Sequence, residues 1–135
     1  MRAAVLAVLM VLTAFPAQST SLSLSGVARI FCEAVISGQM TPVLDLLTHE
    51  LRVMVEDNGE VPLLWQGDLD PAETCIPVGN RGTRDRPETI ISFGAIGKPN
   101  FAQTIVMVFV EGTLRIDDVI FEDGTTLRQR LAVRA

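Results

Sequence analysis

The first half of the chain shows two apolar patterns with the spacing of amphipathic helices. Over residues 26–37, apolar side chains recur every three or four positions and Gly38 follows, which predicts a helix. Thr41 and Pro42 are typical of a helix start, and the second pattern predicts a helix over 42–56. The inner stripe of this second helix consists of Val43, Leu47, Leu51 and Met54.

The last third of the chain changes to patterns typical of β-strands. Three segments rich in Ile, Val and Phe predict strands over 89–96, 102–110 and 114–122. The middle one is almost continuously apolar, which indicates burial on both faces of a sheet. A short helix is predicted over 126–133. Pro and Gly recur through 60–87, so this segment between the two halves is predicted to be irregular.

Two helices followed by an antiparallel meander indicate a single α+β domain over 26–135, with the N-terminal helices packed on a curved, cone-like antiparallel sheet. The Leu47-Thr48-x-x-Leu51 helix and the segment 112–120 (GTLRIDDVI), which leads into a last short helix, resemble the nuclear-transport-factor-2-like, or cystatin-like, superfamily. The chain looks like the small exported bacterial branch of that superfamily, whose members mostly lack an assigned function. The superfamily contains enzymes and pure binding modules, so the resemblance implies a fold and leaves the function open.

The N-terminal segment has the pattern of a secretory signal peptide. Arg2 is followed by a short apolar run and then by small residues suited to cleavage. Cleavage after Ser19 fits the small-residue positions better than cleavage after Ala17. The run is too short for a stable transmembrane span, so no membrane attachment is expected after cleavage. We therefore expect a signal peptide over 1–19, a flexible lead-in over 20–25 and a domain that is periplasmic or secreted.

Both cysteines, Cys32 and Cys75, follow the predicted signal peptide. An even pair in an exported chain predicts one disulfide. It would pin the irregular segment 60–87 to the first helix. Two free thiols and a redox pair are the alternatives, although redox use normally requires Cys-x-x-Cys.

Composition narrows the classes of partner. The formal net charge of −5 becomes −6 when Arg2 leaves with the signal peptide, which argues against nucleic acid and against an anionic membrane surface. The sequence shows no nucleotide-, phosphate- or zinc-binding motif, so no cofactor and no metal are expected. Asp68 and Asp70, with Glu73 nearby, offer oxygen ligands suited to calcium, but a simple turn is the alternative because the rest of a calcium loop is missing.

Two carboxylates are the candidates for catalysis. Glu50 falls inside the apolar stripe of the second predicted helix, where desolvation would raise the pKa of its carboxyl group. A small rotation of the helix, or pairing with Arg115, is the alternative. Side chains alternate along a strand, so Asp118 shares the face of Leu114 and would meet Glu50 if that face were interior. His49, the one histidine, is interpreted as a surface or boundary residue, with a catalytic base as the alternative.

The middle of the chain holds the candidates for binding. Trp65 is the one tryptophan, and Arg81, Arg84 and Arg86 form a basic segment on an otherwise acidic chain. These side chains are candidates for contact with an anionic group or a protein partner, with a solvated loop as the alternative.

These patterns predict an exported small binding or protein-interaction domain without catalytic activity, whose partner is an unknown protein or a small apolar ligand. One alternative is an enzyme that uses an interior carboxylate, Glu50 or Asp118, on a small apolar substrate. The other is an immunity-type inhibitor of a secreted toxin that acts through 65–86.

Overall fold

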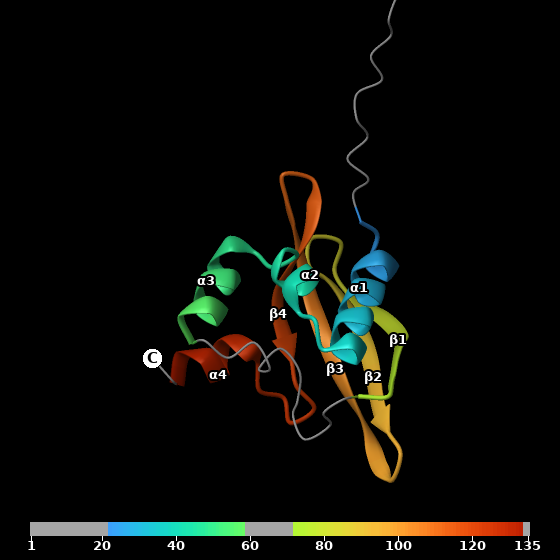
Figure 1. Ribbon diagram of the computed structural model, residues 1–135. Helices are drawn as coiled ribbons and strands as arrows, with labels where there is room; N and C mark the ends of the chain where they lie inside the picture. Colours follow the sequence, from blue (N-terminus) through green and yellow to red (C-terminus); the bar gives the residue numbers. More distant parts are fainter. Residues whose placement is uncertain (1–21, 59–71, 134–135) are drawn as a thin grey trace, which may run out of the picture.

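The computed structural model describes residues 22–58 and 72–133, which form helices and a four-stranded antiparallel sheet (Figure 1). The strands lie side by side in chain order: β1 (Thr74–Gly82), β2 (Pro87–Ala95), β3 (Lys98–Val110) and β4 (Thr113–Ile120). The helices are α1 (Leu24–Ser37), α2 (Thr41–Leu44), α3 (His49–Asn58) and α4 (Leu127–Val133). The predicted α+β class is confirmed, and the predicted signal peptide over 1–19 lies outside the described residues.

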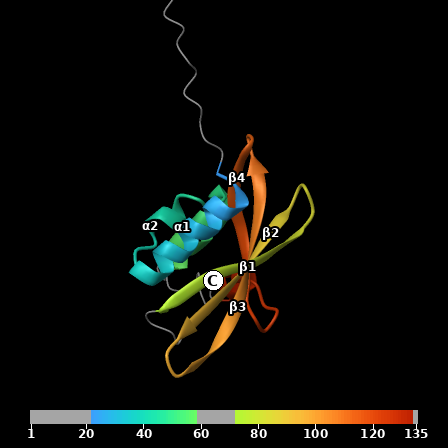
Figure 2. The same ribbon diagram turned by 90° about the vertical axis from the view of Figure 1, so that its right-hand side faces the viewer.

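Helix α1 packs against β1 and β2, and Figure 2 shows α1 and α2 on one side of the sheet. The helix begins two residues earlier than predicted, inside the predicted lead-in, because the Ser23 hydroxyl accepts a hydrogen bond from the Gly26 N–H at 3.2 Å. It ends at Gly38, whose positive φ of 74° suits glycine. On the buried side of α1, the Phe31 ring lies 6.2 Å from the Phe93 ring of β2.

The single helix predicted over 42–56 is wrong, because the chain forms two helices with a non-helical bend, residues 45–48, between them. In this bend the Thr48 N–H donates to the Ile116 carbonyl and the Ile116 N–H donates to the Leu46 carbonyl, both at 2.8 Å. These bonds to the edge of β4 take the place of helical ones. Thr48 Oγ1 then accepts from the Leu51 N–H at 3.4 Å and caps the start of α3.

Strand β1 lies in the segment that the sequence predicts to be irregular, so that prediction is wrong for 74–82. The strand pairs with β2, and an extra residue between Pro77 and Gly79 forms a bulge. Proline and a bulge are tolerated at a sheet edge, where they also discourage the addition of another strand. Pro77 and the bulge before Gly79 therefore make β1 hard to predict from the sequence and also suit it to the edge of the sheet.

Strand β3 has a neighbour on each side, and residues 103–107 are all buried. This confirms the burial on both faces that the apolar run predicts. The strand turns into β4 at Glu111 and Gly112, which have φ values of 51° and 78°. Two successive positive φ angles are typical of a type I′ turn, which matches the twist of a hairpin.

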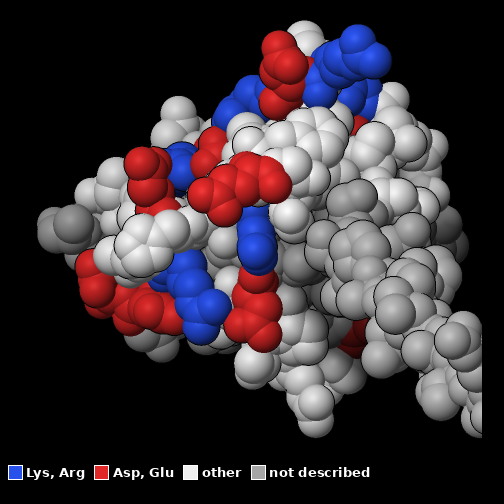
Figure 3. Space-filling view, turned by 90° about the horizontal axis from the view of Figure 1, so that it is seen from above, with Lys and Arg blue, Asp and Glu red and all other residues white. Residues whose placement is uncertain are grey.

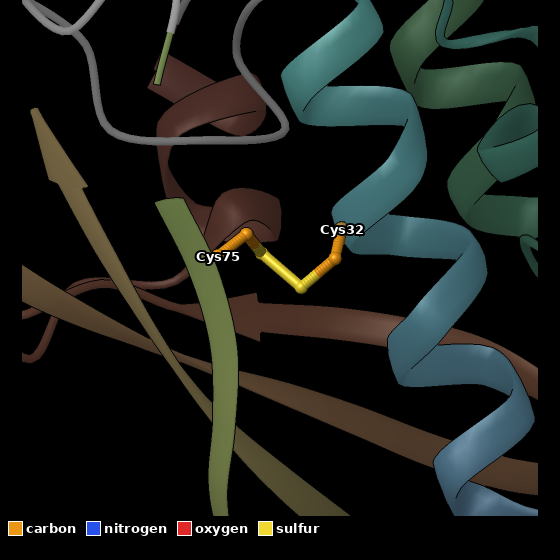
Figure 4. Close-up of a disulfide and its surroundings, with 2 residues drawn as sticks. All are labelled: Cys32 and Cys75. Carbon is orange, nitrogen blue, oxygen red and sulfur yellow. A yellow bond between two sulfur atoms is a disulfide. The ribbon is translucent and has the colours of Figure 1, made fainter. Parts of the chain in front are cut away.

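The disulfide predicted from the two cysteines is confirmed. Cys32 on α1 is bonded to Cys75 on β1, with 5.3 Å between their Cα atoms and 43 residues of sequence separation (Figure 4). The bond joins the first helix to the edge strand of the sheet. It is a covalent link between two elements that the chain brings together only on folding.

Candidate functional site

A β-bulge in β4 decides where the two adjacent aspartates lie. Asp118 pairs with Val106 and Ile116 pairs with Met107, so Asp117 is an extra residue between the two pairs. The bulge reverses the alternation of side chains along the strand. Asp118 therefore lies on the face opposite to Ile116, and the prediction that it shares the face of Leu114 is wrong.

Asp118 is buried, and one oxygen of its carboxylate holds local structure. Its Oδ1 accepts a hydrogen bond from the Val119 N–H at 2.9 Å and one from the Arg128 N–H at 3.1 Å. Arg128 lies in the first turn of α4, where N–H groups have no partner within the helix. Asp118 thus fastens α4 to β4, and it does not meet Glu50.

Glu50 lies in the first turn of α3 with 83% of its side chain exposed, so its predicted place in a buried stripe is wrong. The bend before α3 changes the direction that each residue faces, and Leu51 and Val55 form the buried side instead. Arg128 Nη1 lies 3.7 Å from its carboxylate. His49 is exposed next to it, as predicted. The burial that made Glu50 a candidate for catalysis is absent.

Asp117 is the centre of a polar network that the sequence does not reveal. Its carboxylate accepts hydrogen bonds from Thr48 Oγ1 at 3.2 Å, Arg86 Nη1 at 2.9 Å and Arg128 Nη2 at 2.6 Å. Burial by itself raises the pKa of this carboxyl group, but the bonds and charges of Arg86 and Arg128 outweigh burial and lower it. The network joins the start of α3, the β1–β2 turn and α4 to one point on β4.

The three arginines of the predicted basic segment have different surroundings. Arg81 Nε lies 3.5 Å from the carboxylate of Glu88, and Arg86 is held by Asp117. Arg84, at the tip of the β1–β2 turn, is exposed and has no partner among the described residues. Trp65 lies outside those residues. The structure therefore leaves Arg84 as the one arginine of the segment free to contact a partner.

A second exposed feature lies at the same end of the sheet. The β1–β2 turn begins after Gly82, which pairs with Pro87 of β2. The next residue of β2, Glu88, pairs with Val106 near the C-terminal end of β3, so this turn and the β3–β4 turn lie at the same end of the sheet. At that end Phe109 and Val110 are 53% and 45% exposed, because the β3–β4 hairpin extends past the helices (Figure 1). We call residues 83–86 and 109–112 together the hairpin end.

Charge and shape both vary across the hairpin end. Figure 3 looks down on it and shows basic side chains gathered at a protruding edge, with acidic side chains among them. Beside it, Val110 lines an open groove of about 400 Å³. The other residues that line the groove are Asp45, Leu47, Thr48, His49, Arg52 and Arg115. The exposed Val110 thus lies in the same groove as Arg52 and Arg115.

The described residues contain no group of three His, Cys, Asp or Glu side chains able to hold a metal ion. Asp68 and Asp70 lie outside them, and the Glu73 carboxylate accepts a hydrogen bond from the Ile96 N–H at 3.3 Å. No helix within 22–58 or 72–133 has the length and apolar character needed to cross a membrane. Comparison of the chain with family models, curated proteins and solved structures finds no match.

Proposed function

We propose that this chain is an exported protein-interaction domain without catalytic activity, and that it binds a protein partner through the hairpin end. The observation that carries the proposal is the exposure of Phe109 and Val110 on a hairpin that the helices leave uncovered. Aromatic and arginine side chains supply much of the binding energy in protein interfaces. Phe109 supplies an aromatic side chain and Arg84 an arginine side chain at the same end of the sheet.

The exposed side chains of the hairpin end also indicate the kind of surface that the partner presents. The exposed ring of Phe109 fits a shallow apolar pocket, and the free guanidinium of Arg84 fits a carboxylate at its rim. An inhibitor of a secreted toxin is one class of protein with such a surface. The enzyme alternative lacks comparable support, since Glu50 is exposed and Asp118 is bonded to backbone N–H groups.

Export is supported by the signal-like pattern over 1–19 and by the Cys32–Cys75 disulfide, which is typical of oxidising compartments. The order of helices before an antiparallel sheet supports the cone-like arrangement and the resemblance to the nuclear-transport-factor-2-like superfamily. We infer that the sheet is the rigid support for the interacting hairpins.

Site-specific photo-crosslinking tests the proposal with a matched pair of positions. A photoreactive residue is introduced at Val110 or at Ile36, which are 45% and 44% exposed but lie on the β3–β4 hairpin and on α1. In cells that produce the protein, we expect one discrete crosslinked species from position 110 and none from position 36. The species should disappear when Arg84→Glu is added, because the charge at position 84 is reversed.

Equal crosslinking from both positions would show nonspecific contact and contradict the proposal. The absence of any crosslink at position 110 would contradict it as well. Secretion and the oxidised state of the variants are checked on the same samples, so that loss of folding is distinguished from loss of contact.

A further inference from the structure

The groove beside the hairpin end is positively charged on a chain whose overall charge is negative. Among the side chains that line its volume of about 400 Å³, Arg52 and Arg115 are positive and Asp45 is negative. With the histidine neutral, the lining carries one net positive charge, whereas the whole chain carries −5. Val110 adds an apolar wall that is 45% exposed. Such a local field raises the concentration of anionic groups at the groove.

Arg115 is the cation of this groove that keeps donors for a ligand. Its Nη1 donates to the backbone carbonyl of Asp45 at 2.5 Å, which orients the guanidinium and uses one of its five N–H groups. Arg115 is half-buried and has no carboxylate partner among the described residues. The other half-buried arginines there each have one, and these are Arg52, Arg128 and Arg130. Arg52 bonds to both Asp45 and Glu56, so less of its charge is available.

We propose that this groove binds a carboxylate of the protein partner, carried beside an apolar side chain that contacts Val110. The inference rests on the proposed function, because the groove shares Val110 with the hairpin end. A carboxylate can accept two parallel N–H bonds from one guanidinium, which an oriented arginine offers. One negative charge also balances the one net positive charge of the lining, whereas a doubly charged phosphate would exceed it.

The first test uses N-acetyl-leucine, which carries one carboxylate on an apolar body, and N-acetyl-leucinamide as its neutral control. Binding to the purified full chain is followed by ¹⁵N NMR through the Val110 backbone amide and the Arg115 Nε–H signal. The Arg115 signal is assigned by its absence in Arg115→Gln. We expect a saturable shift of both signals with the carboxylate and none with the amide. Arg115→Gln should bind about tenfold more weakly, which corresponds to about 1.4 kcal/mol.

Three further variants separate the groove from general effects of charge. Arg29→Gln removes the same charge from an exposed position on α1 and should keep the wild-type affinity. Asp45→Asn should bind several-fold more tightly, because it removes the negative charge from the groove. The Asp45 side chain is 64% exposed and bonds only to Arg52 among the described residues, so the fold should survive. Arg115→Lys is the second variant in case Arg115→Gln fails to fold, and its affinity should lie between the two.

The titration can overturn the proposal in several ways. It would do so if N-acetyl-leucine shifted neither signal, if the Arg115 variants bound as tightly as wild type, or if inorganic phosphate bound more tightly than the probe. Binding that occurs only after Glu60, Asp68 and Asp70 are changed to their amides would also overturn it. That result would identify a carboxylate of this chain as the occupant of the groove.

The second test concerns the partner itself and uses the photoreactive residue at position 110. Arg115→Gln should reduce the yield of the crosslinked species, and Arg115→Lys should reduce it less. An undiminished yield in Arg115→Gln would contradict the carboxylate contact and leave the interaction through the hairpin end standing. The absence of a crosslink together with a positive titration would contradict the proposed function, and would assign the groove to a small carboxylate molecule instead of a protein.

Discussion

Asp117→Asn tests the polar network at the β4 bulge, because it removes one charge and keeps the shape of the side chain. The carboxylate is 18% exposed and accepts hydrogen bonds from Arg86 and Arg128 at 2.9 and 2.6 Å. A hydrogen bond to a charged group contributes about 1.5–3 kcal/mol. Both arginines keep access to solvent and the Asn oxygen still accepts one bond, which reduces the loss. We expect the free energy of unfolding at pH 7 to fall by about 2 kcal/mol.

The effect of Asp117→Asn should depend on pH. Burial acts to raise the pKa of Asp117, but Arg86 and Arg128 lower it overall. A carboxyl group with a lowered folded pKa contributes stability above its unfolded pKa of about 3.9, and that contribution is lost as pH falls through the folded value. The difference between wild type and variant should therefore be complete above about pH 5 and narrow below about pH 4.

Urea denaturation at neutral and acidic pH measures both quantities. Asp85→Asn is the control, because Asp85 is exposed in the β1–β2 turn and has no ion pair among the described residues. The control should change the free energy of unfolding by less than about 0.5 kcal/mol. A similarly small effect of Asp117→Asn at pH 7, or a difference that stays constant into acid, would refute the role assigned to the network.

Two further substitutions test the disulfide and the exposure of Glu50. Replacing Cys32 and Cys75 together by Ser opens a loop of 43 residues, so the free energy of unfolding should fall by about 4 kcal/mol. Reduction of the wild type should give the same loss, and a loss below about 1 kcal/mol would contradict the prediction. Glu50→Leu should change the free energy by less than about 0.5 kcal/mol, because the side chain is 83% exposed. A gain of about 1–2 kcal/mol would instead indicate a buried, unpaired carboxylate.

Elements that depend on local pattern could be predicted from the sequence. The first helix has a regular apolar stripe and a terminal glycine, and β3 has a long apolar run because it is buried on both faces. The disulfide followed from an even cysteine count in a chain with a signal-like start. In each case the deciding interaction lies within the segment or in the composition, where the sequence displays it.

Elements that depend on a neighbouring strand could not be predicted. The helix over 42–56 breaks because Thr48 bonds to Ile116, a residue far away along the chain. The one local signal was Thr48 itself, which is a good N-cap residue. Strand β1 forms because β2 offers partners, although Pro77 and Gly79 argue against a strand. Residue spacing alone does not show these distant bonds.

Dependence on distant contacts also explains why the sequence misplaced Asp118 and did not predict the role of Asp117. Strict alternation placed Asp118 on the face of Leu114, and one extra residue in β4 reversed that placement. The bulge also brought Asp117 to Thr48, Arg86 and Arg128, which come from three different parts of the chain. Gln103 is the one polar residue but Thr104 in the apolar run 101–110, and its burial without a side-chain partner among the described residues is visible only in the fold.

The β1–β2 hairpin depends on anchors at both of its ends. Strand β1 is exposed along almost its whole length and so contributes little buried surface of its own. The Cys75 disulfide holds its beginning to α1, and the Arg86–Asp117 pair holds the turn that follows it to β4. Between these anchors Arg84 is left free at a tip whose backbone is fixed. A recognition residue on a fixed turn loses less conformational entropy on binding than one on a mobile loop. The two anchors therefore affect stability and the proposed contact together, and loss of Asp117 should weaken crosslinking from position 110 even where the fold survives.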